Sequence, residues 1–429
     1  MKKMNNRWQS VLLSLALFGL AACTGDFEDI NRNPNQVTDD QMDALNYKTG
    51  TKFKALQSLV IPVQEHMYQF NESLSGGPFG GYIGATVDTW QTKFETYNPS
   101  ADWRKWPFAN VITETYTPYK GIVNGTEDEV AIAFARLLRV AIMHRVTDSY
   151  GPIPYSKMQN GTFSVPYDSQ RDVYMAMIDD LDAAMETLYT FASAGDGILM
   201  RDFDISSFKG DSRLWVSFAN TLKLRMAIRM SGVEPEARRI AEEAVRDMAT
   251  YGLIDANAEN LSFSSDSRQN PFYTQATSTS WQDLRSNASI VMYMNAYEDP
   301  RRASYFSKSG YDGIYVGVRA GIQNVTPTDY ATYSYPLFAE KDPVPVMYAS
   351  ESWFLRAEGA LRGWAMGGDA RSFYEEGIRL SFERCGVADQ LTAYMASTAL
   401  PGSYDDPAFG YSCSNQSTVT IPWLSLIHI

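Results

Sequence analysis

The sequence predicts a mainly α-helical protein, in which paired helices form a scaffold and a loop-rich irregular insertion interrupts them. Apolar residues recur with a helical period through most of the chain, and short turns containing Gly and Pro separate the helical stretches. The chain has 429 residues, of which 45% are hydrophobic and 20% are charged. A globular protein of this size can bury a sizeable core without disulfides or metal ions.

The best-defined helix is expected in the stretch 126–150, at the centre of the scaffold. Thr126 and Glu129 have the spacing of a capping box, in which each side chain accepts a hydrogen bond from the other residue's backbone N–H. Apolar residues then cover most of the helix circumference, which is typical of a helix buried between neighbours. The sequence Gly-Pro-Ile-Pro at 151–154 ends the helix, because glycine favours a turn and proline cannot continue an α-helix.

The remaining helices are expected mostly in pairs, with apolar stripes that face one another across short turns. They are expected at about 40–59 with a continuation to 70, and at 105–124, 169–191, 215–226, 237–248, 353–364 and 374–385. Small residues on the last two stripes, such as Ala357 and Gly377, allow close approach of the helices. Helical hairpins of roughly 40 residues with small residues at their contacts are similar to a tetratricopeptide-type solenoid.

Two stretches depart from the helical period. Residues 71–106 contain five Gly, two Pro and seven aromatic rings, and they are expected to form a long loop. Residues 257–345 are rich in turn residues and Tyr, and they are expected to form an insertion packed on the helices. A long loop with bulky rings in a compact domain is usually functional or poorly ordered.

The N-terminal residues are expected to direct export. Residues 1–22 have a basic start, a short apolar run at 11–20 and small residues before Cys23, so they are predicted to form a signal peptide. Small residues directly before a Cys resemble the lipobox of bacterial lipoproteins, in which this Cys is lipidated and becomes the mature N-terminus. Residues 23–40 would then form a lipidated tether that anchors the protein to a membrane without spanning it. The alternative is an ordinary secretory signal in which Cys23 is present by chance.

Composition and motifs argue against several classes of function. A formal net charge of −13 leaves no basic footprint for nucleic acid. HExxH, GxSxG, P-loop and CxxC motifs do not occur in the sequence, which contains only three His. The sequence therefore predicts no catalytic residue, no cofactor and no metal site.

Several polar residues in the predicted helices are given structural roles. His144 lies within the central helix and is expected to be a satisfied core histidine. The three Asp residues in 179–182 are expected to form a solvated face rather than an acid/base pair. Cys385 is expected to be a buried thiol on a helix, and a disulfide with Cys413 is the alternative.

Several segments resemble one known family, in the order in which that family has them. Besides the lipobox they are NRNPN, ARLLRVAIMHRVTDSYGPIPYS, PYDSQRDVYMAMIDDLDAA, FKGDSRLWVSFANTLKLRMAIRMS, EDPRRASYFS and ASESWFLRAEGALRGWAMGGDARSFYEEGIRLSF. These segments are similar to the SusD/RagB family, and the VTDSYGPIPYS form resembles its SusD-like subgroup. The resemblance extends from Cys23 to about Val387.

The resemblance implies both a fold and a function. The implied fold is a tetratricopeptide-like scaffold of helical hairpins that carries a less regular region. The implied protein is a lipoprotein of Bacteroidota, exposed at the surface of the outer membrane and held there by its lipid anchor. Members of the family sit as a lid on a SusC-like TonB-dependent transporter and capture glycans, or in some branches peptides, and they are not enzymes.

The expected organisation is one helical domain, with an uncertain end. This SusD-like domain is expected at 41–423, with the insertion at about 257–345. The family usually continues well past a final helical pair, whereas this chain ends soon after one. The last six residues, LSLIHI at 424–429, also match the translation of a common sequencing adapter. We therefore expect a C-terminally truncated gene fragment, and a genuine short C-terminus is the alternative.

Candidate ligand contacts are chosen by composition, because the family's ligand contacts are not fixed by a motif. A flat aromatic ring can cover the apolar face of a sugar while Asn, Asp and Arg satisfy its hydroxyl groups. The candidates are Tyr82, Trp90, Tyr97, Trp103 and Trp106, with Asn98, Asp102 and Arg104 as polar neighbours, and a second cluster of Asn270, Phe272, Tyr273 and Trp281. The alternative for each ring is a packing role that holds a loop on the scaffold.

The sequence thus favours a non-catalytic surface lipoprotein that captures oligosaccharides or other nutrients for a TonB-dependent transporter. One alternative is a secreted surface glycoside hydrolase, because its paired carboxylates can lie far apart in the sequence. A second alternative is a helical-repeat scaffold without a small ligand. Saturable glycan binding without product release would distinguish the first class from the other two.

Overall fold

The computed structural model describes residues 47–87, 92–158, 164–265, 268–277, 281–322 and 328–423. The chain groups into two units, residues 1–49 and 50–429, and the description below concerns the second unit. Cys23, Trp90 and the segment 424–429 lie outside the described residues, as do the expected signal peptide and tether. What the sequence predicts for these parts stays a prediction.

Helices dominate the described residues. The longer ones are α4 (Tyr47–Val60), α8 (Val111–Val123), α9 (Glu129–Tyr150), α10 (Gln170–Ala194), α11 (Ser212–Met230), α12 (Ala237–Arg246), α15 (Ala288–Ala296), α17 (Ala349–Leu361) and α18 (Ala370–Arg384). The shorter ones are α5 (Glu65–Tyr68), α6 (Gly76–Phe79), α7 (Ala101–Lys105), α13 (Met248–Tyr251), α14 (Pro271–Thr277), α16 (Arg302–Tyr305) and α19 (Leu391–Met395). Single helical turns of π or 3-10 type are η2 (Gln69–Ser73), η3 (Phe94–Thr96), η4 (Trp106–Asn110), η5 (Arg201–Phe203), η6 (Asn257–Glu259) and η7 (Ala388–Gln390).

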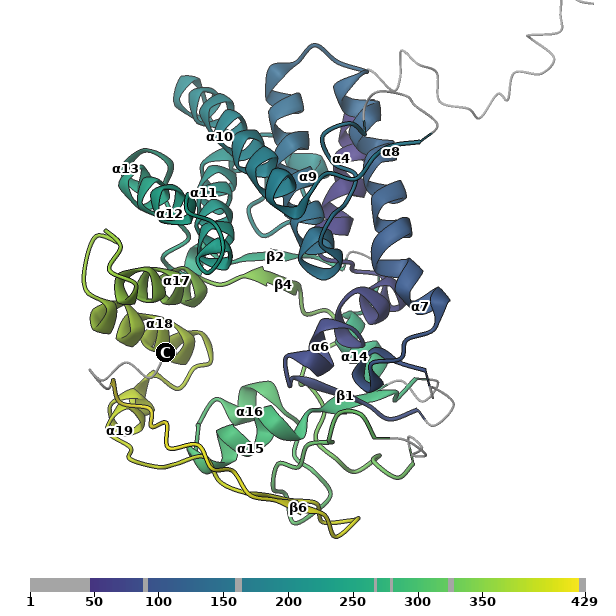
Figure 1. Cartoon of the computed structure of the whole chain (residues 1–429), viewed down its shortest axis with the longest axis vertical. Helices are drawn as coiled ribbons and strands as arrows, with labels where there is room; N and C mark the ends of the chain where they lie inside the picture. Colours follow the sequence, from purple (N-terminus) through teal and green to yellow (C-terminus); the bar gives the residue numbers. More distant parts are fainter. Residues whose placement is uncertain are drawn as a thin grey trace, which may run out of the picture. The chain divides into compact units, whose positions relative to one another are not determined.

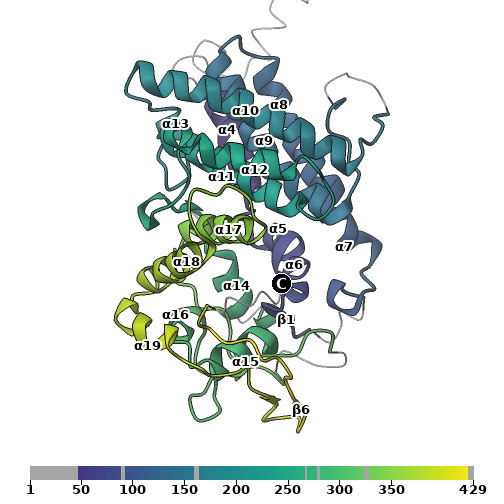
Figure 2. The same cartoon turned by 60° about the vertical axis from the view of Figure 1, so that its left-hand side comes forward.

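Consecutive helices pack side by side and form the scaffold. Helix α9 packs between α8 and α10, α11 packs between α10 and α12, and α17 packs on both α11 and α18 (Figure 1). Figure 2 shows α10, α11 and α12 lying next to one another. One continuous apolar cluster runs through these helices. The predicted mainly α-helical scaffold of hairpins is therefore confirmed.

Helix α9 is buried and ends where the sequence predicts, but it begins differently. Its N-cap is Asp128, whose carboxylate accepts hydrogen bonds from the backbone N–H groups of Val130 at 2.9 Å and Ala131 at 3.4 Å. The Thr126 hydroxyl instead accepts from the N–H of Asp128 at 3.1 Å, so the predicted capping box is wrong. A carboxylate at the first turn also complements the positive end of the helix dipole, which favours this start over the one at Thr126.

His144 has the structural role that the sequence predicts. Its side chain is buried, and its Nδ1 lies 3.1 Å from the carbonyl oxygen of Val140. Burial, together with the nearby charges of Arg225 and Arg229, lowers the pKa of His144 to about 3, so the ring is neutral at physiological pH.

The acidic residues of α10 differ from the expected solvated face. Asp180 pairs with Arg139 of α9 and accepts a hydrogen bond from the Tyr155 hydroxyl at 2.6 Å. Asp182 accepts from the Lys223 ammonium of α11 at 2.6 Å. Asp179 is exposed and the Asp182 side chain is 44% exposed, whereas that of Asp180 is 19% exposed, so the prediction of a solvated face is wrong for Asp180. The physical reason is that α10 lies between two helices, which leaves one face of it open to solvent.

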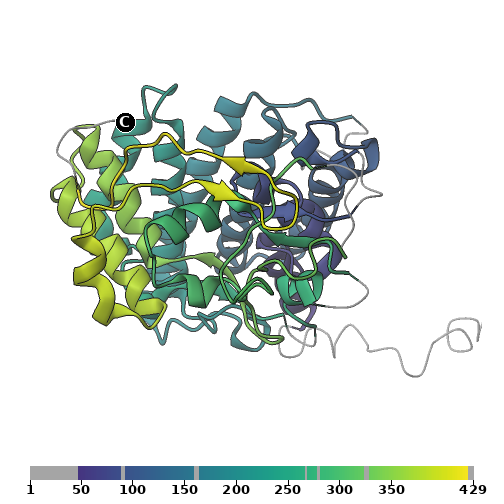
Figure 3. The same cartoon turned by 90° about the horizontal axis from the view of Figure 1, so that it is seen from below.

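Short antiparallel strand pairs connect distant parts of the chain. Strand β1 (Ile83–Ala85) pairs with β3 (Leu284–Ser286), β2 (Leu261–Phe263) with β4 (Val344–Met347), and β5 (Tyr404–Asp405) with β6 (Ser412–Cys413). The β1–β3 pair joins the aromatic stretch before the scaffold to the insertion far behind it in sequence. Figure 3 shows the β5–β6 hairpin, coloured yellow, running across the face in view.

The two described cysteines are unpaired, and the described helices are not of the membrane-spanning kind. Cys385 is half-buried at the end of α18 and Cys413 is exposed, and both are free thiols, so the alternative of a disulfide is wrong. No helix in the described part of the chain combines the length and the apolar character needed to cross a membrane.

Candidate functional site

Residues 71–106, which we call the aromatic segment, are more regular than the long loop that the sequence predicts. Their described part contains α6, β1, η3 and α7. A glycine supplies the turn before β1: Gly81 has a φ of 73°, in the left-handed region that favours glycine. Pairing of β1 with β3 then fixes the middle of the segment.

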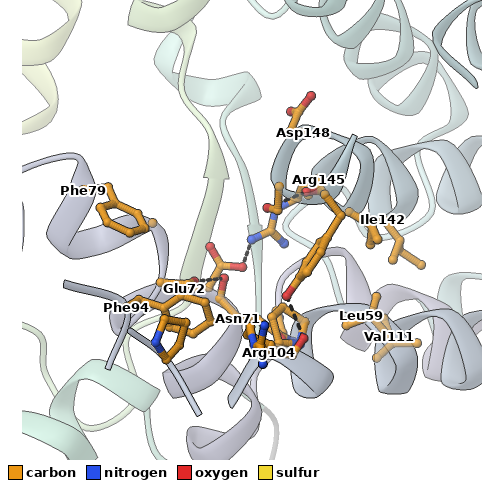
Figure 4. Close-up of a pocket in the computed structure, with 18 of the residues that line it drawn as sticks. Leu59, Asn71, Glu72, Phe79, Phe94, Arg104, Val111, Ile142, Arg145 and Asp148 are labelled. Atoms are coloured by element: carbon orange, nitrogen blue, oxygen red, sulfur yellow. Dashed lines mark hydrogen bonds and ion pairs between the residues drawn. The ribbon is translucent and has the colours of Figure 1, made fainter. Parts of the chain in front are cut away.

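A cavity of about 630 Å³ lies between the aromatic segment and the C-terminal end of α9. Figure 4 shows Phe79 and Phe94 on one side of it, and Leu59, Val111 and Ile142 on the other. The volume lies within the range of about 300–1,000 Å³ that is typical of small-molecule sites. The apolar walls and the polar groups between them give this cavity the mixed lining of such a site.

Four of the charged side chains in the cavity wall form ion pairs, and Arg104 also lines the wall. Glu72 forms an ion pair with Arg145, and Asp148 forms one with Arg229 (Figure 4 shows the first pair). Arg145 also donates from Nη1 to the carbonyl oxygen of Val60 at 2.7 Å. Burial lowers the pKa of Arg145 to about 10, so the guanidinium is still charged at neutral pH. These groups can exchange hydrogen bonds with ligand hydroxyls, since charged partners make the stronger bonds.

Three rings of the aromatic segment are exposed, and we call them the aromatic platform: Phe79, Tyr82 and Tyr97. Their exposed fractions are 54%, 59% and 85%. The ring centroids of Phe79 and Tyr97 lie 5.4 Å apart with an angle of 36° between the planes. Solvent-exposed rings of this kind leave apolar faces available to a ligand.

A buried ion pair supports the turn that presents Tyr97. The Lys93 ammonium lies 2.6 Å from Glu95 Oε1, and both side chains are almost fully buried. Glu95 Oε2 accepts a hydrogen bond from the backbone N–H of Ala85 at 3.2 Å, which connects the turn to β1. Tyr97 itself has a φ of 57°, in the left-handed region that non-glycine residues rarely adopt. The turn therefore holds the most exposed ring in a conformation that its own backbone does not prefer.

The other predicted rings come together in a packed cluster. The His66 ring lies 5.3 Å from the ring of Trp106 and 6.5 Å from that of Trp281, and the Phe70 ring lies 5.2 Å from that of Trp103. All three tryptophans are half-buried. The cluster thus joins the two groups of candidates, one from the aromatic segment and one from the insertion. This geometry suits rings that hold the two segments together.

The remaining candidates of the insertion are placed differently. Asn270 is fully buried: its amide donates to the carbonyl of Asp342 at 3.0 Å, and its oxygen accepts from the backbone N–H groups of Phe272 and Tyr273. Asn270 therefore organises the start of α14. The Tyr273 side chain is half-buried.

Sequence reasoning did not select Phe79, Phe94 or Arg145 as site residues. Phe79 stands between pairs of glycines in GGPFGG, a pattern in which a bulky ring cannot be enclosed by its immediate neighbours. The GGPFGG pattern could therefore have indicated that the Phe79 ring is exposed. The positions of Phe94 and Arg145 depend on contacts between distant parts of the chain, which the sequence pattern does not contain. Within the described residues, no group of three or more His, Cys, Asp or Glu side chains could hold a metal ion.

Comparison with known proteins places the chain in a family. The family model described as SusD-like, Susd and RagB outer membrane lipoprotein, matches residues 29–425. The comparison with curated proteins found no match.

Solved structures agree with the family match. A SusD homologue from Bacteroides thetaiotaomicron is 43% identical, with a TM-score of 0.80 over 88% of this chain and 78% of that one. A homologue from Bacteroides ovatus is 37% identical, with a TM-score of 0.81 over 89% and 80%. A chitin-binding SusD homologue from Flavobacterium johnsoniae is 33% identical, with a TM-score of 0.81 over 88% and 80%. The chain therefore belongs to the SusD/RagB family of outer-membrane lipoproteins, which are non-catalytic binding proteins with a tetratricopeptide-like helical fold.

Proposed function

We propose that this protein captures oligosaccharides at the cell surface and delivers them to a SusC-like TonB-dependent transporter. The observation that carries the proposal is the aromatic platform, three exposed rings on the segment that also lines the 630 Å³ cavity. A sugar ring has an apolar face of C–H groups, which a flat ring covers, and a rim of hydroxyls, which charged side chains satisfy. The aromatic platform supplies the flat rings, and the charged side chains of the cavity supply hydrogen-bond partners for the hydroxyls.

The chemistry of the relatives supports the same ligand class. The homologue from Flavobacterium johnsoniae binds chitin, and it aligns over 88% of this chain. The lipid anchor proposed at Cys23 would hold the binding site at the membrane that contains the transporter. The SusC-like partner is inferred from the family, in which binding protein and transporter work together.

Glycan binding by ring variants tests the proposal. Wild-type protein without residues 1–23 is screened on a glycan array, and dissociation constants for the best ligand are measured by calorimetry. Tyr97→Ala and Phe79→Ala are each expected to weaken binding about tenfold, the loss of one stacking contact. Tyr189→Ala is the matched control, because Tyr189 is also exposed but lies on α10 in the scaffold. Its affinity is expected to equal that of the wild type.

Two outcomes would contradict the proposal in different ways. Absence of binding to every glycan would favour the helical-repeat scaffold without a small ligand. Binding that neither ring variant weakens would show that the glycan site lies away from the aromatic platform. The transporter is tested separately: the full-length lipoprotein, solubilised from outer membranes, is expected to co-purify with a TonB-dependent barrel. Purification without such a barrel would argue against delivery to that partner.

A further inference from the structure

A second cavity, of about 340 Å³, lies next to the aromatic platform. Phe79 lines both this cavity and the larger one, so the two are neighbours on either side of one exposed ring. The walls come from α6, the start of α15 and the β5–β6 hairpin, with Ser289, Tyr404 and Tyr411 among them. A ligand that extends over Phe79 can therefore contact both cavities.

Arg319 gives the second cavity its charge. Among the described residues that line the cavity, it is the only one that carries a formal charge. Its guanidinium carbon lies 3.7 Å from the centroid of the Tyr411 ring, so the ring supports one face of the cation. Its Nε is buried, and no described residue accepts a hydrogen bond from it. A buried donor without a partner costs free energy, which an acceptor supplied by a ligand would recover.

Nearby groups of the protein do not neutralise Arg319 by contact. Asp406 is a buried carboxylate on the same hairpin, but it accepts from the hydroxyls of Tyr333 at 2.5 Å and Tyr404 at 3.2 Å. It also accepts from the backbone N–H groups of Ala408 and Phe409, both at 3.1 Å. Within the described part of the chain, Arg319 forms no ion pair with a carboxylate, and its close contact is with the Tyr411 ring. Among the described residues, the Arg319 guanidinium is therefore available to an anionic ligand.

Helix α15 adds to the positive potential. It is nine residues long and begins in the cavity wall, with Asn287 as its N-cap. The N–H of Ala288 donates to the Val318 carbonyl at 2.8 Å, and the N–H of Ser289 donates to Asn287 at 2.9 Å. These first-turn donors are already used, so the helix contributes a favourable field rather than hydrogen bonds. The exposed Ser289 hydroxyl remains close to the cavity as a further donor.

We propose that this second cavity binds the anionic substituent of an acidic glycan, a carboxylate or a sulfate, through Arg319. The planar guanidinium matches either oxyanion with paired N–H donors. The inference rests on the proposed function, because the neutral part of the same glycan would lie over Phe79 and in the larger cavity. It narrows the ligand class from glycans in general to oligosaccharides that carry a negative charge.

The test is a glycan array printed with matched acidic and neutral pairs. The acidic members carry uronic acids, sialic acid or sulfate, and each neutral partner has the same backbone with the acid esterified or absent. Wild-type protein is compared with Arg319→Gln, which removes the charge and keeps a polar side chain. Arg238→Gln is the matched control, because Arg238 is exposed on α12 and its charge is lost in the same way.

The expected results separate this inference from the proposed function. Wild-type and Arg238→Gln proteins should prefer the acidic members, and Arg319→Gln should bind them about 10- to 100-fold more weakly while keeping its affinity for the neutral partners. Carboxylated and sulfated arms show which oxyanion is preferred. Equal binding of acidic and neutral partners by the wild type, or an acidic preference unchanged in Arg319→Gln, would overturn the inference and leave glycan capture standing. Absence of all binding would overturn both.

Discussion

Trp215 in the scaffold and Tyr97 in the aromatic segment show how differently two regions of this molecule use an aromatic ring. Trp215 is fully buried, packs 5.0 Å from the Phe134 ring, and donates from its indole N–H to Asp204 at 3.0 Å. Tyr97 is 85% exposed on a left-handed turn. The first ring contributes to the free energy of folding through the area that it buries. The second leaves its apolar area available for a ligand.

Charged residues differ in the same way between the two regions. In the scaffold, Arg139–Asp180 and Lys223–Asp182 join neighbouring helices. In the aromatic segment, the buried pair Lys93–Glu95 supports the turn that presents the exposed Tyr97 ring. In the scaffold, the ion pairs thus stabilise the packing of the helices. In the aromatic segment, the ion pair stabilises a turn that keeps the Tyr97 ring exposed. Variants in the two regions are therefore expected to affect stability and glycan binding to different extents.

The largest expected effect is on the scaffold side. Trp215→Ala removes a ring that packs against four phenylalanines, and the cavity it leaves is expected to lower the free energy of unfolding by about 3–5 kcal/mol. Denaturant unfolding measures the loss. Glycan affinity of the protein that remains folded should be unchanged. A loss below about 1 kcal/mol would show that Trp215 is not a central part of the core.

A smaller effect is expected at the support of the turn. Lys93→Met leaves the Glu95 carboxylate buried without its partner, and it is expected to lower the free energy of unfolding by about 2–4 kcal/mol and to weaken glycan binding. The double variant Lys93→Met/Glu95→Gln removes both charges and should recover much of the stability. If the double variant is as unstable as the single one, the buried charge is not the cause.

Asp283, in the insertion directly before β3, contacts the aromatic segment through the backbone N–H of Thr86 and is expected to make stability depend on pH. Its carboxylate accepts from Gln69 in η2, and burial raises its pKa to about 7 from an ordinary value near 3.9. The folded state holds the proton of Asp283 more tightly than the unfolded state does. The stability that this group contributes is therefore fully present below about pH 4 and is lost as the pH rises through about 7. Asp283→Asn cannot titrate, so its stability relative to wild type should rise by roughly 1–3 kcal/mol between pH 4 and pH 8. Parallel pH profiles of the two proteins would contradict this.

The smallest effect on stability is expected at the platform itself. Tyr97→Ala removes an exposed ring, so the free energy of unfolding should change by less than about 0.5 kcal/mol. The same variant is expected to lose about tenfold in glycan affinity. Equal loss of stability and affinity would mean that Tyr97 has a packing role, and the contrast with Trp215 would disappear.

The two regions also differ in how far the sequence predicts them. Helix α9 follows from local rules, because its apolar residues and the Gly-Pro pattern after Tyr150 act within a few residues of one another. The roles of Asp180 and Asp182 could not be predicted, since their partners lie on neighbouring helices about 41 positions away. Of the candidate rings, Tyr82 and Tyr97 are exposed, whereas Trp103, Trp106 and Trp281 are half-buried. Composition identified the segment but not which rings the tertiary packing would cover.

A crystal structure of the protein with the glycan selected on the array would show whether the aromatic platform binds the sugar. We expect a sugar ring stacked on Phe79 or Tyr97 at about 4 Å, with its hydroxyls directed toward the cavity that Glu72 and Arg145 line. A sugar bound elsewhere, with both rings still free, would contradict it.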